Sequence, residues 1–242
     1  DRELRNYWVS SGATSLLPKF VDNMEMKMEY FDHCFIEGDT LETSDVVNGG
    51  AELFLYQSGY LTIKGYDDGV YILGFPNFEV RKALYRVVVP ALTMKSNSEV
   101  VSAQSFLRKM MQDGNAAEAK KALKALIADV PYSNKKMASM NMEERYRLIM
   151  STIFRALGFR VEVERMLATG RIDMIVEVPS FIYVLELKLS NNGGISAAES
   201  QIKEKSYTEP FKADKRKVIA LAVELDETGK GLIDWKEVDE SL

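Results

Sequence analysis

Three residues in the C-terminal half of the chain have the types and the spacing of a catalytic group. Asp173 is followed thirteen residues later by Glu186 and, two positions further on, by Lys188. Because residues i and i+2 of a strand share a face, Glu186 and Lys188 point the same way. A turn at Pro179-Ser180 would pair their strand with the strand that carries Asp173. We therefore expect two carboxylates and one ammonium group to lie together on the surface of a sheet.

This trio suits the hydrolysis of a phosphoester. Two carboxylates supply the hard oxygen ligands that Mg²⁺ prefers, and the ion keeps several of its waters. The metal lowers the pKa of a bound water and neutralises charge on a phosphoryl oxygen, while a lysine can orient the water and stabilise the transition state. We interpret Asp173 and Glu186 as ligands of Mg²⁺ or Mn²⁺ and Lys188 as the catalytic lysine. An isolated Glu-x-Lys on a strand is ordinarily a solvated ion pair.

The composition argues against several other classes of protein. The 242 residues include one cysteine, Cys34, so no internal disulfide can form. The single histidine, His33, stands next to it, and two adjacent residues cannot supply the four ligands of a structural zinc site. A serine or cysteine catalytic triad is not expected either, because His33 is the one histidine it could use. The net charge of −5 argues against avid nonspecific binding of nucleic acid but allows an acidic metal site. No apolar run approaches the ~20 residues of a membrane helix, and no secretory signal opens the chain. We expect a cytoplasmic protein with no membrane partner.

The elements around the trio indicate an α/β or α+β domain with a mixed sheet. Apolar residues at helical spacing predict a helix that follows Asn141 and ends at Gly158. The spacing then changes to that of strands, and a second helix ends before Pro210. The predicted strands are FRVEVERM, RIDMIVEV and FIYVLELKL and, after the second helix, KVIALAVEL. The tail GKGLIDWKEVD is expected to be short and polar.

The first half of the chain predicts a smaller α+β module followed by a helical region. Residues 1–35 are interpreted as irregular or helical, and AELFLYQSG as a short helix ended by Gly59. YLTIK and VYILGF then predict a hairpin around GYDDG, an arrangement typical of a winged helix. Residues 98–130 predict helices, with Ser98 as the first cap. The hairpin tip carries two aspartates, which have the wrong sign for phosphate, so a DNA-binding wing is the weakest interpretation.

The stretch from residue 142 to 239 resembles a PD-(D/E)xK nuclease domain. It is similar in particular to the family at the C-terminus of bacterial AAA-ATPase-like proteins, common in Bacteroides and relatives. Residues 1–90 resemble the end of the AAA-ATPase-like region of those proteins, with W-x-x-S-G at Trp8 to Gly12. The segments that carry the resemblance are ERYRLIMSTIFRALGF, VEVERMLATGRIDMIVEV, FIYVLELKL, AAESQIKEKSYTEPF, YQSGYLTIK and LGFPNFEVR.

The resemblance implies three parts and one absent partner. Residues 1–90 would be the C-terminal, winged-helix-like part of an AAA-ATPase-like region, 91–140 a helical connector, and 141–242 a restriction-endonuclease-like nuclease domain. The chain has no G-x-x-x-x-G-K-[ST] phosphate loop, so a catalytic ATPase part would lie upstream.

The resemblance also assigns roles to individual residues. Asp173 matches the aspartate of the motif, Glu186 its second acidic residue and Lys188 its lysine. Glu143 matches the acidic residue of the first helix that often completes the metal site, with Glu144 as the alternative register.

The helix after the motif supplies the expected nucleic-acid contacts, Gln201, Lys205 and Tyr207. Gln201 matches the glutamine that contacts the site or the DNA in related nucleases. Two positions depart from the pattern: Ile172 stands where the motif has proline, and Lys205 stands where RecB-like nucleases have a tyrosine, with Tyr207 two residues further on.

Two interpretations of different classes stay open. The first is a metal-dependent nuclease that hydrolyses phosphodiester bonds of DNA or RNA, with DNA as the expected partner. The second is a catalytically inactive nuclease-fold module that serves protein or nucleic-acid interaction next to an ATPase-like domain. A bound metal between Asp173 and Glu186 would separate the two.

Overall fold

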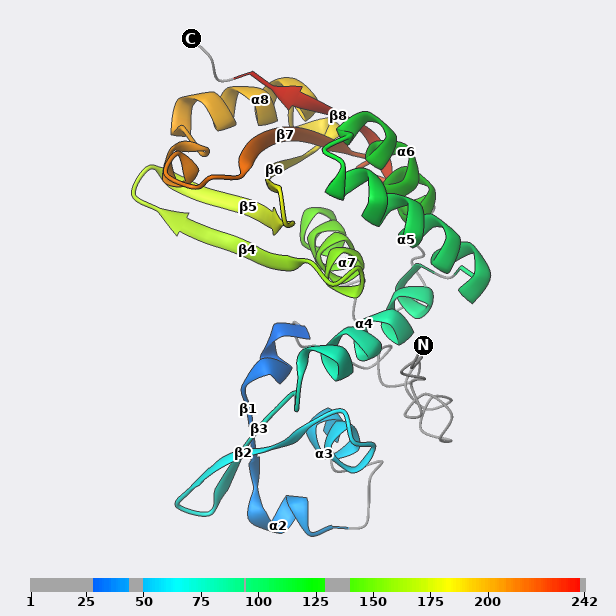
Figure 1. Ribbon diagram of the computed structural model, residues 1–242, viewed down its shortest axis with the longest axis vertical. Coiled ribbons are helices and arrows are strands. Elements are labelled where there is room, and N and C mark those ends of the chain that lie inside the picture. The colour runs from blue at the N-terminus through cyan, green and yellow to red at the C-terminus, as the bar shows by residue number, and fades with distance from the viewer. Residues whose placement is uncertain (1–27, 44–49, 94, 129–139, 240–242) are drawn as a thin grey trace. The chain divides into compact units, whose positions relative to one another are not determined.

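The computed structural model describes residues 28–43, 50–93, 95–128 and 140–239, which form two compact units, 1–88 and 89–242 (Figure 1). Each unit combines helices with one sheet, so the fold class expected from the sequence, mixed α/β with a smaller α+β part first, is confirmed. The W-x-x-S-G motif at Trp8 to Gly12 lies outside the described residues.

The N-terminal unit contains a three-stranded antiparallel sheet in the order β1-β3-β2. The predicted helix and hairpin are present, and Gly59 follows the helix with a positive φ of 78°. The strand β1 lies where irregular or helical structure was expected, because its four residues carry too short a pattern to be read without the pairing to β3. The elements are η3 (Met28–Asp32), β1 (Cys34–Glu37), α2 (Gly38–Leu41), α3 (Gly50–Gln57), β2 (Thr62–Asp67) and β3 (Val70–Gly74). Helix α4 (Phe78–Thr93) begins in this unit and ends in the next.

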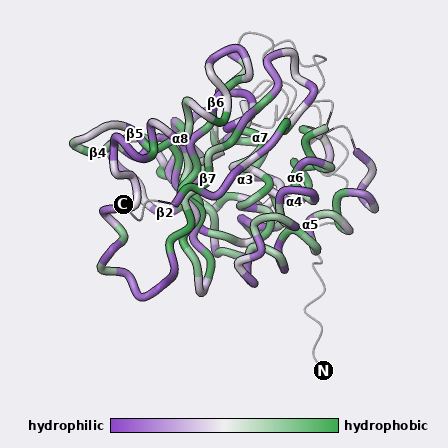
Figure 2. Tube along the Cα trace, turned by 90° about the horizontal axis from the view of Figure 1, so that it is seen from above, coloured by the Kyte–Doolittle hydropathy of each residue, from purple (hydrophilic) through white to green (hydrophobic). Residues whose placement is uncertain are grey.

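The C-terminal unit begins with the helices α5 (Asn97–Gln112) and α6 (Ala116–Ile127), which pack against each other. Hydrophobic and hydrophilic residues alternate along both, as amphipathic helices require (Figure 2). The cap of α5 is Ser96 rather than the expected Ser98. Ser96 stands three residues before Glu99, and the two form a reciprocal capping box, which a cap at Ser98 could not.

A five-stranded mixed sheet in the order β4-β5-β6-β7-β8 fills the rest of the unit. Only β6 and β7 pair in parallel, joined by a crossover through α8. Figure 1 shows α8 on one side of the sheet, and α7 with the α5–α6 pair on the other. The elements are α7 (Met142–Ala156), β4 (Arg160–Leu167), β5 (Gly170–Glu177), β6 (Phe181–Leu189), η5 (Ser190–Asn192), α8 (Gly194–Lys205), η6 (Glu209–Phe211), β7 (Lys217–Leu225) and β8 (Leu232–Val238).

The last strand, β8, is the main correction to the expected element order. The tail was expected to be short and polar, but it pairs antiparallel with β7 along most of its length. Its buried residues, Leu232, Trp235 and Val238, recur every third position instead of every second, so the alternation that signals a strand is missing. Trp235 Nε1 donates a hydrogen bond to the Ala116 carbonyl, which ties the strand to α6.

The core between α8 and the sheet combines aliphatic side chains of α8 and of the strands β5 to β8 with the aromatic rings of Tyr207 and Phe211. On the opposite side, the hydroxyl of Tyr183 in β6 donates to the Met111 carbonyl at the end of α5. The helical stretch before residue 128 thus packs directly on the sheet. Among the described residues, no helix is long and apolar enough to cross a membrane.

Candidate active site

Asp173 and Glu186 stand opposite each other on the hairpin of β5 and β6. The ladder between the two strands ends at the pair of Met174 and Leu185, and Asp173 and Glu186 are the next residues away from the turn on their strands. Both are buried, with relative exposures of 4% and 1%. Asp173 Oδ2 accepts a hydrogen bond of 2.9 Å from the Leu187 amide, which anchors its carboxylate on the neighbouring strand. The structure therefore brings the two expected ligands together beneath the surface.

Lys188 completes the trio on the same strand. Its Nζ lies 2.6 Å from Glu186 Oε1, and its side chain is only 15% exposed. Burial on its own would lower the pKa of this ammonium group, but the hydrogen bond to Glu186 and the negative charges of Asp173 and Glu143 outweigh burial and leave the pKa raised. Lys188 is thus a fixed positive charge beside the carboxylates.

The environment of Glu186 disfavours its charged form. Burial is the largest cause and the neighbouring charge of Asp173 the second, and together they raise the pKa of Glu186 to about 8 against the opposing effect of Lys188. Glu186 Oε2 is buried and has no hydrogen-bond partner among the described residues unless it carries a proton that it donates to Asp173. The atom therefore needs either a proton or a cation.

Glu143, and not Glu144, faces the pair of carboxylates. Asn141 caps α7 by accepting from the Glu144 amide, and Glu144 itself is exposed. Glu143 is half-buried, and burial together with the charge of Asp173 raises its pKa. The structure thus selects the first of the two registers that the sequence left open.

Two charged residues at the site were not found from the sequence. The buried guanidinium of Arg147 pairs with Glu143 at 3.0 Å, with Asp173 at 3.2 Å and with Glu164 at 3.1 Å. The spacing of Glu143 and Arg147, one helical turn apart, is a signal that could have pointed to Arg147. Nothing comparable marks Glu164, because a glutamate in an alternating strand is ordinarily exposed.

The three expected nucleic-acid contacts differ in exposure. Tyr207 is completely buried, and its hydroxyl donates 2.8 Å to the Arg171 carbonyl and accepts 2.9 Å from Gln201 Nε2. Its ring therefore presents no surface to a nucleic acid. Gln201 is partly exposed at the end of this hydrogen-bond chain, and Lys205 is exposed. The glutamine and tyrosine meet even though their spacing departs from the related nucleases.

The donor set can hold one hard cation. Asp173 and Glu186 supply carboxylate oxygens from facing strands, and the unsatisfied Glu186 Oε2 is a position where a cation would replace a proton. Within the described ranges, no group of three or more histidine, cysteine, aspartate or glutamate side chains is arranged to hold a metal ion. A metal bound by this pair would therefore keep several water ligands, as Mg²⁺ does.

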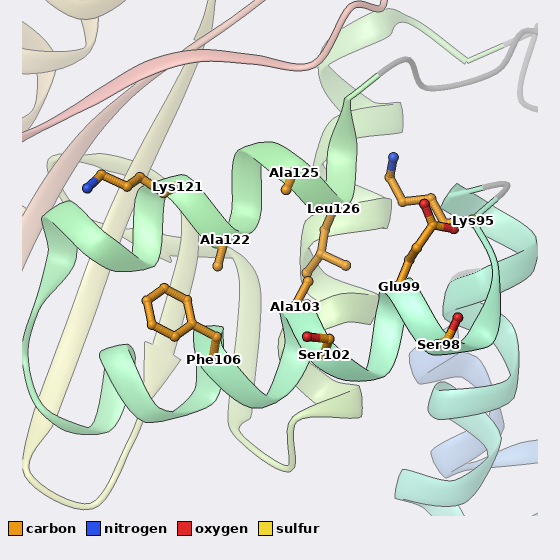
Figure 3. A pocket seen from close by; sticks show the side chains of 10 residues that line it. All are labelled: Lys95, Ser98, Glu99, Ser102, Ala103, Phe106, Lys121, Ala122, Ala125 and Leu126. Atoms are coloured by element: carbon orange, nitrogen blue, oxygen red, sulfur yellow. The ribbon is translucent and has the colours of Figure 1, made fainter.

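A pocket between α5 and α6 lacks a pair of facing carboxylates. Its walls are mostly alanine, serine and aliphatic side chains with Phe106 (Figure 3). Two of its three charged residues have local partners: Glu99 pairs with Ser96 in the capping box, and Lys121 forms an ion pair with Glu118. The pocket has one acidic residue, Glu99, whereas Asp173 and Glu186 form a pair of acidic groups at the sheet.

Comparison with known proteins finds a similarity for the part of the chain that carries the site. Residues 141–235 match the family model of the PD-(D/E)XK nuclease superfamily, and this range contains Glu143, Asp173, Glu186 and Lys188. Over its full length the chain is 25% identical to a protein of Azotobacter chroococcum mcd 1 described as an uncharacterized protein in the vnfD 5' region. The alignment covers 47% of that protein, so the chain spans about half the length of this relative. No solved structure matches the chain.

Proposed function

We propose that the C-terminal unit is a metal-dependent nuclease that hydrolyses phosphodiester bonds of DNA or RNA, with DNA as the expected partner. The observation that carries the proposal is the buried carboxylate pair of Asp173 and Glu186 beside the charged Lys188, within the range that matches the nuclease superfamily. A purely structural sheet has no need for two buried acids of the same sign next to each other.

Each residue of the trio has a role in the proposed reaction. Asp173 and Glu186 would hold Mg²⁺ or Mn²⁺, which supplies a bound water of lowered pKa and a positive charge for the scissile phosphate. Lys188, fixed in its charged form, offsets the negative charge that grows on the phosphate in the transition state. Glu143, half-buried at the start of α7, would accept a hydrogen bond from the attacking water or act as a further ligand.

Substrate binding would use polar groups near the end of α8. Gln201 presents an amide held by Tyr207, and Lys205 is exposed to solvent. Other basic residues between 203 and 217 offer less positive charge than their number suggests, because Lys203, Lys212 and Arg216 pair with neighbouring carboxylates. Residues 1–90 would be the winged-helix-like end of an ATPase-like region, joined by 91–140 to the nuclease-like domain of 141–242.

A second candidate function is supported by the charge balance of the site. Arg147 pairs with Glu143 and Asp173, and Lys188 pairs with Glu186, so each candidate ligand already has a cation. Such a balanced cluster could serve a catalytically inactive nuclease fold that binds a protein or a nucleic acid. The unsatisfied Oε2 of Glu186 and its raised pKa favour the catalytic candidate.

The test is cleavage of labelled single- and double-stranded DNA and RNA by the 242-residue chain with Mg²⁺, with Mn²⁺ and with a chelator. Cleavage should require metal and should be lost in Asp173→Asn. The matched control is Asp67→Asn, which changes an exposed aspartate of the N-terminal hairpin and should leave cleavage unchanged. A wild-type chain that cuts no substrate with either metal supports the inactive module, and cleavage by Asp173→Asn at the wild-type rate excludes this site as the catalyst.

A further inference from the structure

Arg147 is the cation on which the carboxylates of the site converge. It lies one turn after Glu143 on α7, and its side chain is 8% exposed. A single nitrogen, Nη2, donates to both Glu143 Oε1 and Asp173 Oδ1, while Nη1 donates to Glu164 Oε1. One guanidinium thus joins carboxylates from α7, β4 and β5.

The backbone of β4 is distorted in favour of this arrangement. Glu164 has a φ of +54°, the left-handed region that residues other than glycine rarely adopt. The ladder between β4 and β5 skips Glu164, which stands across from Asp173 between two regular pairs. The Glu164 carboxylate accepts from Arg147 and from Arg171, both at 3.1 Å. These ion pairs hold a conformation that an unpaired glutamate in a strand would avoid.

Arg147 Nη2 lies between two carboxylate oxygens, a surrounding that also suits a divalent cation. It bridges two carboxylate oxygens from different elements, as a bound divalent cation would. Asp173 has its other oxygen committed to the Leu187 amide, so Oδ1 is the atom that Arg147 and a metal would share. A divalent ion bound to Asp173 Oδ1 would be repelled by the positive charge of the Arg147 guanidinium.

We propose that Arg147 is the built-in counter-cation of the site: it neutralises Asp173 and Glu143 in the metal-free protein and gives up Asp173 when a divalent metal binds. This inference rests on the proposed metal-dependent function. Glu164 supplies the second carboxylate with which the guanidinium stays paired after that exchange. Arg147 is therefore a positioning residue that sets the affinity for metal and does not touch the substrate.

The test measures Mn²⁺ alone binding to the 242-residue chain, by calorimetry and by the electron paramagnetic resonance of free Mn²⁺. Arg147→Gln should bind Mn²⁺ about tenfold more tightly or better, the size of effect that one nearby charge has on an ionisation equilibrium. Arg147→Lys keeps the charge but not the forked geometry that joins three carboxylates, so it should bind Mn²⁺ less tightly than Arg147→Gln. The metal-free Arg147→Gln protein should melt at a lower temperature than wild type and should gain more from Mn²⁺.

The matched control is Arg171→Gln. Arg171 pairs with the same Oε1 of Glu164 but is 49% exposed, and no ion pair joins it to Asp173 or Glu143 within the described residues. Its loss should leave the affinity for Mn²⁺ nearly unchanged, which separates the contact of Arg147 with the ligands from a general loss of positive charge.

A second measurement on the wild-type chain keeps the proposal falsifiable if Arg147→Gln does not fold. The Nε–Hε resonance of Arg147, assigned by its loss in Arg147→Lys, should shift on saturation with Mg²⁺. An unchanged resonance at saturation overturns the proposal. So does a folded Arg147→Gln that binds Mn²⁺ no more tightly than wild type, and in both cases the proposed function stands because the wild type still binds metal. Absence of metal binding in every variant overturns both.

Discussion

Two antiparallel hairpins in this protein carry paired acidic residues in opposite environments. The hairpin of β2 and β3 holds Asp67 and Asp68 at its tip, where both are exposed. The hairpin of β5 and β6 holds Asp173 and Glu186 away from its turn, buried to 4% and 1% exposure. Water screens the first pair, whereas burial and mutual repulsion raise the pKa of Glu186 in the second. The same residue types become chemically useful only where packing removes water.

The two regions also differ in where the backbone is strained. At the tip of the first hairpin the left-handed residues are Asp68 and Gly69, which tolerate that conformation and favour this turn. Beside the second hairpin the left-handed residue is Glu164, which tolerates it poorly. Its ion pairs with Arg147 and Arg171 compensate. Local sequence therefore accounts for the first turn, and only long-range ion pairs account for the second distortion.

The largest expected effect that would sharpen this contrast comes from Lys188→Met. The substitution keeps the apolar stem and removes the charge beside Glu186, so cleavage should fall by on the order of 10²-fold or more, the scale for loss of one preorganised donor. Lys64→Met on the exposed β2 strand is the control and should cleave as wild type does. Rates are measured at saturating Mg²⁺, with folding checked by thermal melting. Equal rates for Lys188→Met and wild type would reduce Lys188 to a structural ion-pair partner.

A smaller effect should appear in the dependence of metal affinity on pH. Glu186 must lose its proton to bind a metal, and its pKa is raised to about 8, so affinity for Mn²⁺ should rise with pH up to about 8, by about tenfold per unit well below that value. The measurement is a calorimetric titration at several pH values. An affinity that is flat between pH 6 and 8 would contradict the raised pKa.

The raised pKa of Glu186 should make the metal-free protein less stable as the pH rises, whereas its affinity for metal increases. A carboxyl group whose pKa is higher in the folded than in the unfolded chain favours folding most below its unfolded value, and this contribution is lost as pH rises through about 8. Urea unfolding should therefore show wild type losing stability relative to Glu186→Gln between pH 5 and 8.

The smallest expected effect lies in the exposed hairpin. Gly69 has a φ of +86°, and a Cβ added there would meet no atom within 4 Å, so Gly69→Ala should cost about 1 kcal/mol through backbone conformation alone. The free energy of unfolding of the N-terminal unit should fall while cleavage stays unchanged. A loss of cleavage comparable to that of Lys188→Met would show that this hairpin takes part in the reaction and would remove the contrast between the two.

Much of the fold could be predicted because its signals are local. The strong helical period after Asn141, the turn at Pro179-Ser180 and the dense apolar strands all appear in the structure where they were expected. The strands β1 and β8 were missed, because the first is too short and the second has buried residues every third position. Both are strands only by virtue of their pairing with β3 and β7.

The sequence by itself determined which residues share a face. The two-residue spacing of Glu186 and Lys188 and the length of the hairpin back to Asp173 already place the trio on one strand pair, since strand periodicity is a property of the local chain. Only the tertiary structure decided that the trio is buried, that Glu143 faces it and Glu144 does not, and that Tyr207 is covered. It alone brought Arg147 and Glu164 into contact with the site. Burial and charge compensation depend on how elements distant in the sequence pack together, and no local pattern records that packing.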